Sequence, residues 1–285
     1  SGSIGSHLVR LLTDAGTDVR TLVRDPAKGQ ALRASYALGD FDQPGTIAAA
    51  LEGVDQFFLN GGSILPTRGE QPMVAQQRAA IDAAREAGVA HIVKISVWGV
   101  RDGGKLAEGA HAAIEAHLAA SGIPATVLRP GGYMQNFITG SGTFFDTNGD
   151  ILGLEATGPV NYIDCADIAA CAAALLTGAA PAGGNHILTG PQALDHHQIA
   201  EKLSTVLEHP IGFRCLTPEA LTQRVIALGV TTEFAADVVS LWSEMEYSAT
   251  TDAVERLTGV APRGFDDFVT ANRDALAEAL RPARN

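Results

Sequence analysis

Apolar residues along this chain recur with two alternating periods, which predict helices and strands in turn. The first helix is expected from Ile4 to Ala15, where apolar side chains recur every three or four positions and Gly16 ends the run. Short β-rich runs then alternate with helical runs. The strands are expected over residues 19–23, 34–39, 56–59, 91–97 and 125–128, and the helices between them over 44–54, 71–87 and 110–121. Such alternation predicts an α/β fold with a doubly wound parallel sheet, the Rossmann arrangement.

The alternation weakens in the second half of the chain. The elements expected there are helices over about 167–177, 195–207 and 217–229, a strand over 186–189, and two or three further helices up to Leu280. Composition shifts near residues 144–154. We therefore predict a dinucleotide-binding domain over 1–152 and a smaller, mostly helical C-terminal substrate domain over 153–285, with 164–190 packing back on the sheet.

Two glycines at the start of the first predicted helix indicate a phosphate site. Gly2 and Gly5 let the backbone approach a pyrophosphate, and free N–H groups of the first turn, near Ser3 and Ile4, supply the positive end of the helix dipole. In the complete fingerprint a strand and a further glycine precede this pair. We therefore expect the natural chain to begin some residues earlier.

Arg24 stands at the end of the second strand, about 20 residues after the glycines, where the fingerprint places the group that meets the adenosine ribose. A carboxylate there binds the free 2′-hydroxyl, whereas a guanidinium accommodates a 2′-phosphate. Arg24 favours NADP(H) over NAD(H), and the neighbouring Asp25 leaves NAD(H) open. The alternative is a solvated turn residue before Pro26.

Further candidates stand at the carboxyl ends of strands, where ligands of open α/β sheets bind. Asp40 and Phe41 would meet the adenine, and Ser96 would lie beside the nicotinamide. Asn60 and Gly61 would line the cofactor, although Asn60 taken alone is equally typical of an ordinary turn. Lys94, on the same strand face as Ser96, is interpreted as a paired structural charge.

The amino-acid composition limits the classes of partner that this chain is expected to bind. The 285 residues are 46% hydrophobic and 18% charged, as in a globular protein, and the net charge of −12 argues against a nucleic-acid surface. We expect a small-molecule partner and no membrane segment.

Three cysteines without metal-ligand spacing indicate reduced thiols in the cytoplasm. His196 and His197 point about 100 degrees apart on a helix, so no metal site is predicted. Asp195 is instead expected to cap that helix.

Several short motifs together resemble the NmrA-like branch of the atypical short-chain dehydrogenases. They are Gly2-x-x-Gly5, Leu22-Val23-Arg24-Asp25-Pro26, Lys94-Ile95-Ser96, Ser121-Gly122-Ile123 before Leu128-Arg129-Pro130-Gly131, and Leu188-Thr189-Gly190-Pro191. The resemblance spans nearly the whole chain. It implies a Rossmann domain, a small substrate domain and NAD(P) between them. Members of this branch include NADPH-dependent reductases of quinones and phenylpropanoids, and also NADP(H)-binding redox sensors without turnover.

One departure from ordinary short-chain dehydrogenases narrows the chemistry. Those enzymes use a Tyr-x-x-x-Lys pair, and no tyrosine in this chain has a lysine four residues later. An epimerase-like enzyme acting on sugar nucleotides is therefore disfavoured. Counted back from Ser121, His111 occupies the position that is a lysine in reductases resembling isoflavone reductase. A histidine with a pKa near neutrality could donate a proton there. The alternative is a helix-surface histidine held by Glu115, four residues on.

The function that unites these residues is an NADPH-dependent reduction of a small carbonyl, quinone or enone. His111, Tyr133 and Ser96 are the candidate catalytic residues, although Tyr133 could simply be a pocket wall. Pro130, Gly131 and Gly132 would line the nicotinamide side. The rival is a sensor of the NADP(H) ratio that binds a protein partner. A monomer and a homodimer both remain open.

Overall fold

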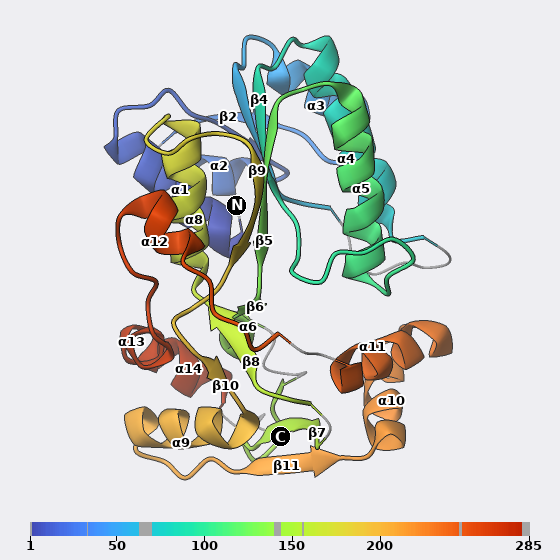
Figure 1. Cartoon of the computed structure of the whole chain (residues 1–285), viewed down its shortest axis with the longest axis vertical. Helices are drawn as coiled ribbons and strands as arrows, with labels where there is room; N and C mark the ends of the chain where they lie inside the picture. Colours follow the sequence, from blue (N-terminus) through green and yellow to red (C-terminus); the bar gives the residue numbers. More distant parts are fainter. Residues whose placement is uncertain are drawn as a thin grey trace. The chain divides into compact units, whose positions relative to one another are not determined.

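The computed structural model describes residues 2–32, 34–62, 70–139, 144–155, 157–244 and 247–280. The chain divides into two compact units (Figure 1). The first comprises Ser1–Pro130, Cys165–Leu188 and Ala253–Val260, and the second comprises Gly131–Asp164, Thr189–Asp252 and Ala261–Asn285. The first segment of the first unit ends at Pro130, where the chain leaves the parallel sheet and pairs next within the second unit.

The first unit is built on parallel strands. Their bounds are β1 (Arg20–Val23), β2 (Ser35–Leu38), β3 (Gln56–Leu59), β4 (His91–Ile95), β5 (Ala125–Pro130) and β9 (Gly184–Leu188). β1 pairs with β2, and the other four form a sheet in the order β3-β4-β5-β9, with every pairing parallel. All five residues of β4 are buried, as expected for a central strand covered on both faces. The predicted α/β fold is confirmed.

Helices cover both faces of this four-stranded sheet (Figure 1). The helices of the first unit are α1 (Ser3–Asp14), α2 (Pro26–Ala31), α3 (Pro44–Leu51), α4 (Pro72–Glu86), α5 (Ala107–Ser121), α8 (Cys165–Leu176) and α12 (Ala253–Thr258). α4 and α5 pack together on one face, and α1 and α8 pack together on the other. Fully buried Ile81, Ile92 and Ile114 belong to the core between β4 and the α4–α5 pair. This burial fixes α5 on the sheet.

The second unit contains two small sheets as well as the expected helices. Its elements are β6 (Gly132–Tyr133), α6 (Asn136–Thr139), β7 (Ile151–Leu154), β8 (Val160–Ile163), β10 (Ala193–Leu194), α9 (His196–Leu207), β11 (Phe213–Leu216), α10 (Pro218–Ile226), α11 (Thr232–Glu244), α13 (Phe265–Ala271) and α14 (Arg273–Ala279). The sheets have the orders β10-β8-β6 and β11-β7. Among the described helices, none has the length and apolar character needed to cross a bilayer.

Local capping in the second unit follows the sequence. Asp195 accepts the backbone N–H of Gln198, whose side chain accepts the N–H of Asp195, and this reciprocal pair opens α9. The two histidines that follow both pack on one aromatic ring. His196 stacks on Phe213 with ring centroids 4.8 Å apart, and His197 meets the edge of the same ring at 5.0 Å. Ring packing is therefore the role that the structure gives this pair.

The start of α5 depends on a close backbone approach at Gly109. A Cβ there would lie 2.1 Å from the carbonyl oxygen of Gly104, and Leu106, which precedes the helix, has a φ of 49°. We expect Gly109→Ala to lower the free energy of unfolding by about 1–3 kcal/mol. Thermal and urea denaturation would measure this loss. Gly45→Ala in α3, where a Cβ meets nothing within 4 Å, is the matched control and should be neutral or slightly stabilising. Equal stability of the two variants would contradict the clash.

Candidate active site

The N-terminus of α1 is open to a ligand. Gly2 is the N-cap residue, no side chain caps the helix, and the first turn carries no acidic residue. A Cβ built on Gly2 or Gly5 would meet no atom of the described residues within 4 Å. Backbone N–H groups at such a helix end suit an anion, because the helix dipole places partial positive charge there. These features fit the pyrophosphate of a dinucleotide, with Ser3 and Ile4 supplying first-turn backbone.

Arg24 and Asp25 have different tasks at the end of β1. The Asp25 carboxylate accepts the backbone N–H of Ala27 at 2.9 Å and caps α2. The Arg24 side chain is 79% exposed, and its guanidinium lies 4.0 Å from the carboxylate of Asp40. Asp25 is therefore occupied as a cap, whereas Arg24 presents a cation to solvent where a ribose phosphate is expected.

The ends of β2 and β3 meet beside this arginine. A Cβ on Gly61 would lie 2.9 Å from the ring of Phe41, so only glycine lets the two segments approach this closely. The Gly61 carbonyl accepts the side-chain amide of Gln77 at 2.7 Å, which ties the segment to α4. Asn60 is exposed. The structure thus brings Phe41 and Gly61 together, and contacts of Asp40, Phe41 and Asn60 with the cofactor stay predictions.

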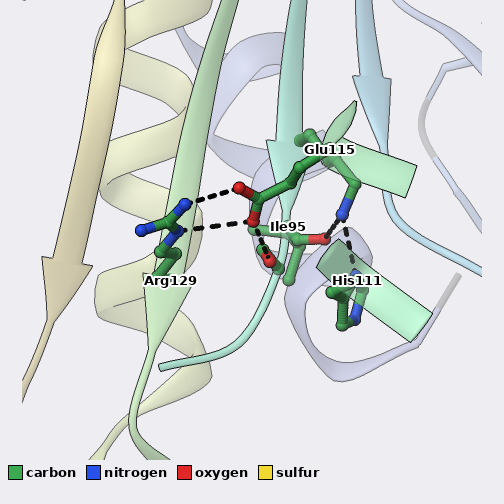
Figure 2. A network of polar contacts seen from close by, with 6 residues as sticks. Ile95, His111, Glu115 and Arg129 are labelled. Atoms are coloured by element: carbon green, nitrogen blue, oxygen red, sulfur yellow. Dashed lines mark hydrogen bonds and ion pairs between the residues drawn. The ribbon is translucent and has the colours of Figure 1, made fainter. Parts of the chain in front are cut away.

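A polar network links β4, α5 and the end of β5 (Figure 2). Lys94 on β4 places its Nζ 3.0 Å from the carbonyl oxygen of Ile95 and 2.8 Å from Nδ1 of His111 on α5. Lys94 is fully buried and His111 is 7% exposed. A lysine side chain therefore contacts an imidazole inside the protein, and the second group that it binds is an uncharged carbonyl.

Glu115, one turn further along α5, binds two other groups of the network. Its Oε1 accepts the hydroxyl of Ser96 at 2.5 Å and Nε of Arg129 at 3.3 Å, and its Oε2 accepts a terminal nitrogen of Arg129 at 2.5 Å (Figure 2). Ser96 follows β4 and Arg129 lies on β5. The bidentate pair with Arg129 therefore holds α5 against β5, and the Ser96 hydrogen bond holds it beside the end of β4.

Burial sets the protonation of the two basic groups. It lowers the pKa of Lys94 to about 7. The charge of Glu115 raises this pKa by a smaller amount, and the charge of Arg129 lowers it further. Burial, with a further contribution from the Lys94 charge, lowers the pKa of His111 to about 3. The sequence-based expectation of a His111 pKa near neutrality is wrong, and so is the alternative in which Glu115 holds the ring. The imidazole is neutral, and the group that titrates near pH 7 is Lys94.

A family comparison agrees with this fold. The model of the NmrA-like family matches residues 1–268. The chain belongs to the NmrA-like family. An NAD(P)H azoreductase from Xenophilus azovorans is 33% identical over 291 residues, which cover 98% of each chain.

Solved structures show the same fold for this NmrA-like chain. An NADPH-dependent quinone oxidoreductase from Escherichia coli, solved with NADPH, has a TM-score of 0.79 and 24% identity, covering 95% of this chain and 96% of that one. The negative transcriptional regulator NmrA, solved with NAD, has a TM-score of 0.72 and 16% identity, covering 97% and 94%. Both likenesses show that the NmrA-like chain shares the fold of these two proteins.

The remaining candidates take structural positions. Ser96 is fully buried and donates its hydroxyl to Glu115, and the carbonyl of Pro130 accepts the backbone N–H of Trp98 at 2.9 Å. Gly131, Gly132 and Tyr133 belong to the second unit. A Cβ on Gly132 would lie 2.7 Å from the ring of Tyr162, so packing accounts for that glycine. Contacts of these residues with nicotinamide stay predictions.

Sequence reasoning missed the contact partner of His111. Strand alternation placed Lys94 and Ser96 on one face of their strand, and helical spacing placed His111 and Glu115 on one face of their helix. In the structure these two faces meet. What the sequence lacked was the register of the helix on the strand. That register pairs Lys94 with His111 and Ser96 with Glu115.

Proposed function

We propose that this chain is an NADPH-dependent oxidoreductase that passes hydride to a small conjugated acceptor, such as a carbonyl, quinone or enone. The observation that carries the proposal is the buried contact of Lys94 with Nδ1 of His111 at 2.8 Å. It supports a neutral imidazole that donates its Nε2–H to an oxygen gaining electrons. The relatives named as an NAD(P)H azoreductase and a quinone oxidoreductase support a conjugated electrophile as the acceptor class.

A few residues of the first unit have tasks in this mechanism. The dinucleotide, when bound, supplies the hydride. Gly2 and Gly5 give its pyrophosphate access to the first turn of α1, and Arg24 offers a partner to a 2′-phosphate. His111 donates a hydrogen bond, and then a proton, to the acceptor oxygen. The Glu115–Arg129 pair holds α5, and therefore His111, at a fixed distance from β5.

Binding and turnover test the proposal separately. Calorimetry with NADPH and NADH should detect binding, with NADPH the tighter ligand. NADPH oxidation should then be followed against a panel of quinones, enones and azo dyes. Tight binding with no consumption by any acceptor would overturn the enzyme and leave the redox sensor. Absence of binding would overturn both.

Cofactor preference depends on Arg24. We expect Arg24→Ala to weaken NADPH binding by about tenfold or more, because one or two charge-assisted hydrogen bonds to the 2′-phosphate are lost. NADH binding should be unchanged. Arg85→Ala, which removes an exposed arginine from the last turn of α4, is the control for net charge. Equal losses for both coenzymes in Arg24→Ala would contradict a 2′-phosphate role.

The cysteines support a cytoplasmic location for this enzyme. Cys165, Cys171 and Cys215 form no disulfide; the first two are buried in α8, and Cys215 is exposed. Burial, with the nearby Asp167 carboxylate, raises the pKa of Cys171 to about 12, so this thiol is protonated and inert. Free thiols are typical of a reducing compartment.

A further inference from the structure

We propose that Lys94 is the positioning residue that fixes the tautomer of His111 and restores its proton during each turnover. The inference rests on the proposed reductase function and deepens it. It assigns a task to a fully buried lysine that the binding of a coenzyme or acceptor does not require. Its basis is the hydrogen-bond geometry between β4 and α5.

The contacts of Lys94 define which nitrogen of His111 carries the proton. An ammonium group has three donors and no acceptor. One N–H bond points at the carbonyl oxygen of Ile95 at 3.0 Å, and another points at Nδ1 of His111 at 2.8 Å. While Lys94 is protonated, Nδ1 must accept, so the ring proton sits on Nε2. Figure 2 shows the other ring nitrogen of His111 directed away from the Ile95 side of the network.

A purely structural role explains the lysine poorly. Its side chain is fully buried, and the nearby carboxylate of Glu115 is already bonded to Ser96 and Arg129. The close partners left for Lys94 are a carbonyl and a neutral imidazole. Burying an ammonium against neutral partners costs free energy that an apolar side chain of the same size would avoid. A residue kept under that cost fits a proton-handling task.

The proton steps balance with one proton from water. As the acceptor carbon gains hydride and its electron pair, the acceptor oxygen takes the Nε2 proton of His111. Nδ1 takes a proton from Lys94, so the ring stays neutral and Lys94 becomes a neutral amine. Since His111 is 7% exposed and Lys94 fully buried, water then reprotonates Nε2 and the Nδ1 proton returns to Lys94. The acceptor gains a hydride and a proton, and the dinucleotide is oxidised.

The charges of Glu115 and Arg129 shift the pKa of Lys94 in opposite directions. The titratable or charged groups on the elements packed around β4 are Glu108, His111, Glu115 and His117 on α5, Arg129 on β5, Arg78, Asp82, Arg85 and Glu86 on α4, and Cys165, Asp167 and Cys171 on α8. Asp82 pairs with His117 at 2.9 Å. Glu115 raises the pKa of Lys94 and Arg129 lowers it, and these are the charges that act on it. Neutralising Glu115 should therefore lower the pKa of Lys94, and neutralising Arg129 should raise it.

The pH profile of kcat/KM tests the relay in the intact chain. Because the relay requires protonated Lys94, the wild-type rate should be high below about pH 7 and fall above it. Arg129→Met should move the midpoint to higher pH and Glu115→Gln to lower pH, each by about one unit. Lys94→Met should abolish the fall in rate above pH 7. It should also reduce kcat roughly tenfold, the effect of one lost hydrogen bond. Both charge variants retain Lys94, so the test survives if Lys94→Met fails to fold.

Nitrogen NMR of the His111 ring gives a readout that does not depend on turnover. In the chain without coenzyme, we expect an unprotonated Nδ1 and a protonated Nε2, with the Nδ1 signal shifting at the Lys94 midpoint. This transition should be absent in Lys94→Met. A protonated Nδ1 in the wild type, or identical pH midpoints in all variants of an active enzyme, would overturn the relay. A wild type that shows the NMR transition but consumes NADPH with no acceptor would instead overturn the reductase function.

Discussion

Replacing Gly5 with leucine is expected to abolish tight NADPH binding while leaving the protein folded. A Cβ on Gly5 meets no atom of the part of the chain that the structure describes within 4 Å, so the larger side chain is directed away from the described core. Leucine in a helix is more favourable than glycine by about 0.6–1 kcal/mol, so the free energy of unfolding should be unchanged or higher. The same side chain would occupy the place of the pyrophosphate at the first turn of α1. We expect a loss of affinity of about 100-fold or more, equivalent to about 2.7 kcal/mol.

Calorimetry and thermal denaturation of the same samples separate the two effects. Gly45→Leu is the matched control, because Gly45 also lies in the first turn of a helix, α3, with nothing near its Cβ position. It should bind NADPH with wild-type affinity. If Gly5→Leu binds NADPH as tightly as the wild type, the pyrophosphate lies elsewhere and the assignment of α1 to the cofactor fails.

Several elements of the first unit, such as β3 and α4, could be predicted because each has a local cause. β3 was expected over the residues it occupies, and α4 within one residue of its observed ends. Both are bounded by turn residues and carry a clear apolar period. The short strands of the second unit have no such signal. β6 is the two residues Gly132 and Tyr133, and its pairing with β8 depends on residues about thirty positions later.

The candidate site was predictable up to the point where long-range register decides the contacts. Spacing alone placed His111 and Glu115 on one face of α5, and the simplest inference was that they interact. In the structure β4 and β5 are in a register that sets Lys94 beside Val127, and α5 crosses them so that His111 meets Lys94 and Glu115 meets Arg129. Burial of Lys94 then shifts the pKa of both partners. No single local pattern contains that information.

Substitution of His111 is expected to have the largest effect on catalysis. We predict that His111→Phe lowers kcat for quinone reduction by about 10²–10⁴-fold, the usual contribution of one general acid, with a smaller change in KM. Phenylalanine keeps the planar ring and the apolar packing but has no Nε2–H to donate. Steady-state NADPH oxidation with a saturating quinone would measure the loss. Coenzyme affinity should be retained, because the dinucleotide contacts expected at Gly2, Gly5 and Arg24 are unchanged.

A second histidine on the same helix provides the control. His117 lies on α5, where its Nε2 contacts the Asp82 carboxylate at 2.9 Å, a partly exposed pair that links α5 to α4. His117→Phe removes an imidazole from α5 and should cost about 0–1 kcal/mol of stability, the range for exposed ion pairs, with kcat unchanged. Because both variants lose one imidazole from one helix, the ratio of their kcat values isolates the proton donor from any general disturbance of α5. Equal kcat values for His111→Phe and the wild type would show that the acceptor oxygen takes its proton from another group.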